Sequence, residues 1–186
     1  MKIGETLDID NRTAWRRWLN AHWRSEDEIW IVYHRAHTGV PRIAYNDAVE
    51  EALCFGWIDS IVRTIDDDAY AQRFTPRSAT SSFSQTNRER LRRLLEQGTL
   101  MPEVEAAVAD VLAEPFVTPP DIEAALRADA SMWKNLTRYS DAYQRIGIAY
   151  VETGRRRPDE FEKRLANLLR KTAADTQFGF GIETYY

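Results

Sequence analysis

Two arginines on either side of a Thr-Pro pair are the residues of this sequence best suited to bind an anion. Arg73 and Arg77 flank Thr75 and Pro76, and a guanidinium presents a planar fork of N–H donors that matches a carboxylate or a phosphate. In a strand that runs up to the proline, Arg73 and Thr75 share one face and Phe74 lies on the other. This spacing predicts a pocket for a small anion.

Three polar residues that follow the arginines extend this hypothesis. Ser81, Ser84 and Asn87 lie just before or inside a predicted helix start, where free backbone N–H groups attract anions. Asp59, on the preceding predicted strand, is placed to orient one arginine. The same residues also fit an alternative, a structural Arg–Asp network that ties the sheet to the next helix, and the sequence leaves both open.

Catalytic residues are harder to find. Cys54 as a nucleophile with His34 as its base is one combination. However, Cys54 stands between Leu53 and Phe55, and a buried cysteine usually behaves as a small apolar residue. The sequence therefore predicts no catalytic residue and favours a non-catalytic protein; an enzyme of unknown reaction that uses the predicted anion pocket is the alternative.

Acidic and histidine residues give no sign of acid–base or metal chemistry. Glu50 and Glu51 are expected on the exposed face of a helix, because adjacent side chains diverge and cannot share one proton site. The spacing of His34 and His37 would allow a shared metal ion, but no CxxC, third histidine or HExxH motif accompanies them. We predict neither a metal site nor a cofactor.

Basic residues gather in two segments, residues 88–93 and 155–157. A helix with several arginines is one feature of nucleic-acid binders, but Glu89 and Glu96 can pair with arginines one turn away. The net charge of −4 and the sequence pI of about 5.5 also differ from the basic domain expected of a duplex binder. Nucleic-acid binding is therefore the weaker alternative.

The composition indicates an ordinary globular protein in a reducing compartment. The single cysteine excludes an intrachain disulfide. The first residues contain no apolar core of signal-peptide length, and no window approaches 18 uninterrupted apolar residues. We therefore expect a cytoplasmic protein that does not insert into membranes, and the sequence leaves its oligomeric state open.

The first half of the chain predicts a small antiparallel sheet with helices packed on it. Asp10 or Asn11 caps a helix that contains an apolar stripe from Trp15 to Trp23. A second helix begins at the cap Asn46 and ends at Gly56. Three strands are expected, at residues 28–35, 58–65 and 69–75.

The second half predicts only helices. They are expected within residues 84–97, 102–112, 121–127, 131–138, 140–152 and 159–174. Because strands come early and helices late, the fold class is α+β, with a three-stranded sheet. We expect an α+β core at residues 1–114 and a helical extension at residues 115–186 that packs on the core as one structural unit; the aromatic tail at residues 178–186 docks or frays.

Two strings of residues also carry a family resemblance. Residues 51–59 read EALCFGWID and residues 73–77 read RFTPR. Together with the Trp15–Trp18 helix and the last predicted helix near Arg157, they resemble the bacteriocin-protection, YdeI/OmpD-associated family over nearly the whole chain. One departure is Phe83, where that family usually has a tryptophan. The resemblance implies an α+β body and a link to bacteriocin protection, but no reaction.

These observations predict a binding protein rather than a catalyst. Its ligand is expected to be a small anion or a protein partner, with a role in resistance to antimicrobial or envelope stress that the resemblance implies. The candidate ligand-binding residues are Trp57, Asp59, Arg73, Arg77, Ser81, Ser84, Asn87 and Arg157.

Overall fold

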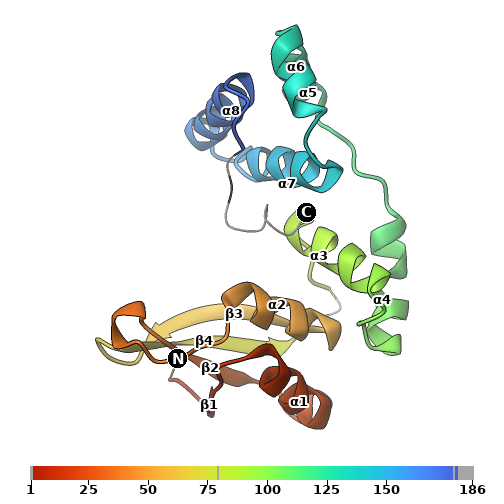
Figure 1. Ribbon diagram of the computed structural model, residues 1–186. Coiled ribbons are helices and arrows are strands. Elements are labelled where there is room, and N and C mark those ends of the chain that lie inside the picture. The colour runs from red at the N-terminus through yellow and green to blue at the C-terminus, as the bar shows by residue number, and fades with distance from the viewer. Residues whose placement is uncertain (1, 79, 178, 180–186) are drawn as a thin grey trace. The chain divides into compact units, whose positions relative to one another are not determined.

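The computed structural model describes residues 2–78, 80–177 and 179, and its residues form two compact units (Figure 1). The first unit comprises the described residues up to Phe83 together with Arg90–Leu112. The second comprises Ser84–Glu89 and the described residues from Ala113 onward. Each unit has its own hydrophobic core.

The sheet of the first unit has four strands in the order β1-β2-β4-β3. The strands are β1 (Thr6–Asp8), β2 (Ile29–His34), β3 (Trp57–Thr64) and β4 (Ala69–Pro76). β2 and β3 both pair antiparallel with β4, which confirms the three predicted strands. The sheet as a whole is mixed, because β1 pairs parallel with β2.

The prediction of a three-stranded antiparallel sheet is therefore wrong by one strand. β1 is only three residues long, and its single apolar residue, Leu7, lies between Thr6 and Asp8. Such a segment shows no period-two alternation that a sequence pattern can detect. Its position is fixed by tertiary pairing, with Thr6 opposite Trp30 and Asp8 opposite Val32.

Helices α1 (Arg12–His22) and α2 (Tyr45–Cys54) pack on this sheet. The predicted cap of α1 is confirmed, because the Oδ1 atom of Asn11 accepts a hydrogen bond of 2.9 Å from the Ala14 backbone N–H. The predicted cap of α2 is wrong. Ala44 precedes that helix, and Asn46 lies in its first turn, where its Oδ1 atom accepts a bond of 2.8 Å from Arg90.

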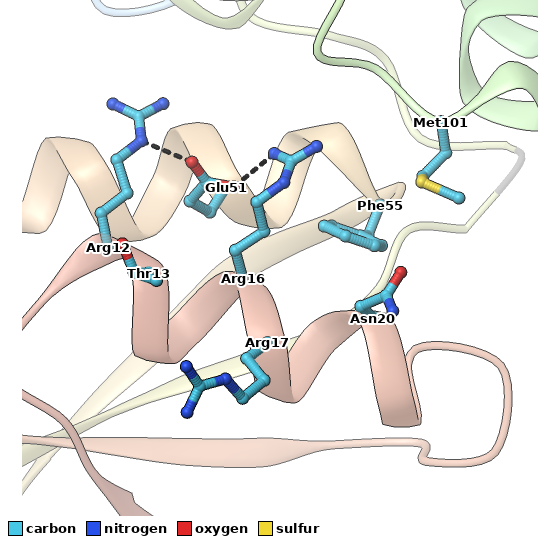
Figure 2. A pocket seen from close by; sticks show the side chains of 8 residues that line it. All are labelled: Arg12, Thr13, Arg16, Arg17, Asn20, Glu51, Phe55 and Met101. Atoms are coloured by element: carbon cyan, nitrogen blue, oxygen red, sulfur yellow. Dashed lines mark hydrogen bonds and ion pairs between the residues drawn. The ribbon is translucent and has the colours of Figure 1, made fainter.

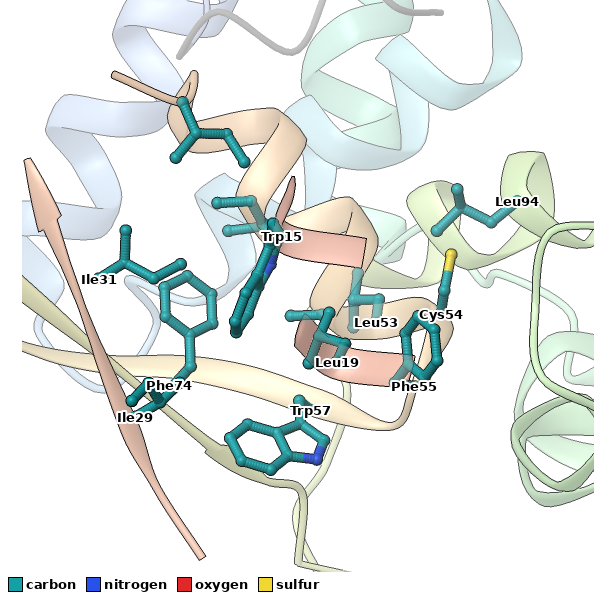
Figure 3. Packing of buried hydrophobic residues seen from close by; sticks show 14 of the residues in the cluster. Trp15, Leu19, Ile29, Ile31, Leu53, Cys54, Phe55, Trp57, Phe74 and Leu94 are labelled. Atoms are coloured by element: carbon teal, nitrogen blue, oxygen red, sulfur yellow. The ribbon is translucent and has the colours of Figure 1, made fainter. Parts of the chain in front are cut away.

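Large aromatic residues pack between these helices and the sheet (Figure 3). Trp15 of α1 is fully buried, lies edge-on to Phe74 of β4 with 5.5 Å between ring centroids, and donates from Nε1 to the carbonyl of Ala48 at 2.9 Å. A single side chain thus contacts α2 and β4 from α1. Because aromatic rings bury the largest apolar area per residue, these contacts fix the spacing between α1 and α2.

A sharp turn follows α2. Gly56 has a φ of +71°, which ends the helix as predicted, and an added Cβ atom would come within 3.3 Å of Val104. The turn leads directly into β3. A short 3-10 helix (Ala36–Thr38) lies between β2 and α2, and helices α3 (Gln85–Glu96) and α4 (Pro102–Ala113) follow β4.

The second unit is helical, as the sequence predicts. It contains the first residues of α3 and the helices α5 (Pro120–Arg127), α6 (Ala130–Leu136), α7 (Asp141–Glu152) and α8 (Pro158–Ala173). Its core includes Ile122, Leu136 and Leu168. The tail at residues 178–186 lies, apart from Gly179, outside the described residues. In the part of the chain that is described, no helix is long and apolar enough to cross a membrane.

Candidate functional site

Trp57, the first predicted site residue, belongs to the core. Its side chain is only 1% exposed, and its Nε1 atom donates to the backbone carbonyl of Trp23 at 3.1 Å. Its ring also lies edge-on to Trp18, with 5.8 Å between centroids. These contacts leave almost no surface of Trp57 for a ligand.

Asp59 and Arg73 lie on opposite faces of the sheet. Asp59 pairs in register with Phe74, so the two share a face, and Arg73 points to the other face. Asp59 accepts a hydrogen bond of 2.8 Å from the hydroxyl of Tyr45. Arg73 forms an ion pair with Glu28, through Nε at 2.6 Å and Nη2 at 2.5 Å. Asp59 was predicted to orient one of the two arginines, but its side-chain hydrogen bonds found among the described residues are with Tyr45 and Gln72.

Arg77 anchors the loop that follows β4. Its Nη2 atom donates to the carbonyl oxygens of Ser81 and Ser82, both at 2.6 Å, and its guanidinium lies 3.6 Å from the centre of the Phe83 ring. Burial lowers the pKa of Arg77. Ser81 thus contacts Arg77 through its backbone carbonyl, which is the contact of a loop anchor and not of an anion pocket.

The remaining predicted residues belong to the second unit. The Oγ atom of Ser84 accepts a hydrogen bond of 3.3 Å from the backbone N–H of Asn87, so Ser84 starts α3 as predicted. Arg157 is exposed and directly precedes α8. The eight predicted residues are thus divided between two units, and whether any of them binds a ligand stays a prediction.

The sequence missed a different group of charges, on α1 and α2. Glu50 and Glu51 were expected in solvent, but they are only 2% and 4% exposed. Glu51 accepts from Nε of Arg12 and from Nη1 of Arg16 at 2.6 Å, while Glu50 lies 3.0 Å from Nη1 of Arg12. A buried carboxylate needs such partners, because an isolated buried charge is strongly unfavourable.

A pocket of about 470 Å³ opens beside this ion-pair cluster, and we call it the arginine pocket (Figure 2). Its volume lies within the range of ligand-binding clefts. α1 supplies five of its residues, α2 supplies Glu51, and Phe55 directly after α2 and Met101 directly before α4 complete it. They are Arg12, Thr13, Arg16, Arg17, Asn20, Glu51, Phe55 and Met101.

Helical spacing explains why these side chains meet. Arg12, Arg16 and Asn20 are four residues apart and form one stripe of α1, beside the stripe of Thr13 and Arg17. Figure 2 shows Glu51 between Arg12 and Arg16, and Arg17 pointing away from it. The arginine stripe faces α2 because the neighbouring stripe of α1 is buried against the sheet.

Nearby acids keep two arginines of the pocket charged and hold them in one orientation. Burial lowers the pKa of Arg12, but hydrogen bonds and the charges of Glu51 and Glu50 outweigh it and raise that pKa. The pKa of Arg16 is also raised, with Glu51 again outweighing burial. Arg16 is held further by the carbonyl of Thr99, at 2.9 Å from Nη2.

Unused donors remain on the pocket side. The Nη2 atom of Arg12 has no hydrogen-bond partner among the described residues, and neither does any nitrogen of the exposed Arg17. A guanidinium has five N–H donors, so each of these side chains can still bind an anion. The arrangement therefore combines rigidly held cations with free donors.

Cys54 is a poor candidate for a nucleophile. It is fully buried, its Sγ lies 3.7 Å from Thr99, and burial raises its pKa, so little reactive thiolate forms. The proposed base His34 is bonded to Asp8 at 2.8 Å. Among the described residues, no group of three or more His, Cys, Asp or Glu side chains could hold a metal ion.

Comparison with known families divides the chain into two matched parts. A family model described as a domain of unknown function (DUF8412) matches residues 7–107. The chain belongs to this family. A second model, described as bacteriocin-protection, YdeI or OmpD-associated, matches residues 115–175. No curated protein and no solved structure matches the chain.

The DUF8412 region contains the whole arginine pocket and also the strings at residues 51–59 and 73–77. The match to the bacteriocin-protection family confirms the predicted resemblance for residues 115–175, in the helical second half of the chain, and the two strings on which the prediction rested lie outside this range. One sequence signal for the pocket existed. Arg12 and Arg16 are one helical turn apart beside an apolar stripe, with two adjacent acids on the next predicted helix.

Proposed function

We propose that this protein binds a small anion in the arginine pocket and thereby takes part in protection against antimicrobial compounds. The observation that carries the proposal is the buried Glu51 carboxylate, which holds Arg12 and Arg16 while Arg17 beside them has no partner among the described residues. Buried acids that fix arginines in one geometry lower the entropy lost when the arginines bind a ligand.

The charges of the pocket favour an anion over a cation. Three guanidinium groups line it against one carboxylate, and both oxygens of that carboxylate already accept hydrogen bonds. Glu50 and Asp47 offset part of the charge of Arg12, so Arg17 supplies the positive charge that is not neutralised locally. A carboxylate or phosphate that reaches Arg17 and the Nη2 of Arg12 would receive charge-assisted hydrogen bonds.

The link to protection comes from the family match. The model that matches residues 115–175 is described by bacteriocin protection and by association with another protein. A binding role fits that description. In addition, we propose that the second unit binds a protein partner. The buried Cys54 and the fully paired Glu51 support binding in place of catalysis, because neither offers a free nucleophile or base.

Thermal unfolding of the purified protein tests the proposal. Sodium phosphate or sodium acetate should raise the melting temperature above that in sodium chloride of equal ionic strength, because a ligand that binds only the folded state stabilises it. At a concentration about 100 times the dissociation constant, the gain is about 2.7 kcal/mol.

The variant Arg17→Gln should keep the stability of the unmodified protein without anion, since Arg17 is exposed and its side chain makes no hydrogen bond or ion pair among the described residues. It should lose most of the stabilisation by anions. Arg156→Gln is the matched control, because it removes one exposed arginine from the second unit and should leave the anion effect intact. Equal stabilisation of the unmodified protein and of Arg17→Gln would exclude the proposed site.

A further inference from the structure

The guanidinium of Arg16 lines the arginine pocket and is held in place by its neighbours. Three groups fix it: the carboxylate of Glu51 at 2.6 Å, the carbonyl of Thr99 at 2.9 Å, and the Phe55 ring, whose centre lies 5.3 Å from the guanidinium carbon. These contacts hold the guanidinium in place, and Phe55 lies against one of its two faces. Phe55 lies on the side of the core, and it is itself buried.

The other face of Arg16 is accessible. Its side chain is 38% exposed although its polar atoms are bonded. Met101 stands at the same end of the pocket, half-buried, with its thioether directed toward Phe55 (Figure 2). A planar cation beside a flexible thioether is a surface on which an aromatic ring can stack.

The anion-binding donors lie one helical turn away. Arg12 precedes Arg16 by four residues, which places the two side chains about 5–6 Å apart at Cβ. A ligand with its acid group at the Nη2 of Arg12 therefore has room for a ring over Arg16. The distance between Arg12 and Arg16 allows one small ligand to contact both side chains.

We propose that the ligand of the arginine pocket is an aromatic acid. Its carboxylate binds the Nη2 of Arg12, its ring stacks on the exposed face of Arg16 and against Met101, and Arg17 adds positive charge to the pocket. This inference rests on the proposed anion-binding function and adds the chemical class of the ligand. The ring is the part that distinguishes this class from acetate or inorganic phosphate.

Three probes of known chemistry test the inference by calorimetric titration at constant ionic strength. Benzoate carries the charge and the ring, acetate carries only the charge, and benzyl alcohol carries only the ring. Benzoate should bind about tenfold more tightly than acetate, which corresponds to one stacked cation–π contact, and benzyl alcohol should bind more weakly than benzoate.

Two variants locate the ring. Arg16→Lys keeps the charge and the ion pair with Glu51 but loses the planar group, so the advantage of benzoate over acetate should disappear while acetate binds as before. Met101→Ala should weaken the binding of benzoate severalfold and leave the binding of acetate unchanged. This variant tests the position of the ring even if Arg16→Lys does not fold.

The outcomes separate the anion-binding proposal from the aromatic-acid proposal. Equal binding of benzoate and acetate would overturn the aromatic acid and leave the anion site standing. No binding of benzoate or acetate would overturn both. Benzyl alcohol that binds as tightly as benzoate would show an apolar site and would also overturn both.

Discussion

The arginine pocket and the end of the sheet at β3 and β4 both combine arginines with acids, but they use them differently. In the pocket, one buried carboxylate joins two arginines, and a third arginine lies beside them without a partner among the described residues. At the sheet end, Arg73 is neutralised by Glu28, and Arg77 is bound to the loop that follows it. The first arrangement places its remaining arginine donors beside a pocket.

The difference follows from where each acid lies. Glu51 is buried between two helices, so its arginines must come to it and are then held in place. Glu28 is on the surface, with its side chain 33% exposed, so its pair with Arg73 is open to water. An arginine near a proline and several serines is therefore a weaker sign of a ligand site than an arginine beside a buried acid.

The largest effect is expected from Glu51→Gln. The substitution removes the charge that Arg12 and Arg16 share, and it should lower the free energy of unfolding by roughly 2 kcal/mol, because a broken buried ion pair is strongly destabilising and these arginines are only partly exposed. Urea denaturation measures the change. Glu105→Gln, an exposed acid of α4, is the control and should change it by less than about 0.5 kcal/mol.

A smaller effect is expected from Arg77→Ala. The loop after β4 loses two hydrogen bonds and the contact with Phe83, so stability should fall by about 1 kcal/mol. Hydrogen exchange at the Ser81 amide, which donates to the Ser78 carbonyl, should become faster. The exposed Arg63→Ala should change neither, and an unchanged loop in Arg77→Ala would mean that Arg77 does not anchor the loop.

The Glu28–Arg73 pair should contribute less again, about 0.5 kcal/mol in Glu28→Gln. The hydrogen bond from Arg73 lowers the pKa of Glu28, so the contribution is complete above the unfolded-state pKa of about 4.3. It is lost as the pH falls below that value. Denaturation of both proteins between pH 7 and about pH 3 should show the two stabilities converging, and a gap larger than that of Glu51→Gln would reverse the comparison.

The smallest effect concerns Asp59. Burial and the negative charge of Asp59 raise the pKa of Tyr45, so the stability that comes from neutral Tyr45 is present below the unfolded-state pKa of about 10 and is lost as the pH rises above it. Asp59→Asn should lower the pKa of Tyr45 and reduce that alkaline loss. Absorbance titration of tyrosinate, with Tyr45→Phe as the reference, would detect the shift; an unchanged curve would mean that Asp59 does not act on Tyr45.

The fold was predictable wherever one segment carried its own signal. Asn11, Gly56 and the β-branched and aromatic residues of β2 mark their elements locally, and the structure agrees. β1 and the start of α2 were missed because both depend on distant partners. Leu7 has no pattern of its own, and Asn46 resembles a cap but instead accepts a hydrogen bond from Arg90.

The candidate site was harder to predict because charged residues on a helix can face solvent or can form a buried ion pair. Glu50 and Glu51 follow the pattern of a solvent-facing pair, and only the arginines of α1 make their burial favourable. Those arginines lie on another helix, far away in the sequence. Conversely, Asp59 was expected to orient one of the two arginines, but the register of β3 and β4 puts Asp59 and Arg73 on opposite faces.

The strand order β1-β2-β4-β3 also has a consequence for how the chain folds. β3 and β4 are joined by a short turn and form a local hairpin, whereas β2 must pair Ile29 with Phe74 and His34 with Ala69 across a long stretch of chain. Closing that loop loses entropy before the central contacts form. We therefore expect the hairpin to form first and β2 to dock later, so the two helices that carry the arginine pocket come together only in the last steps of folding.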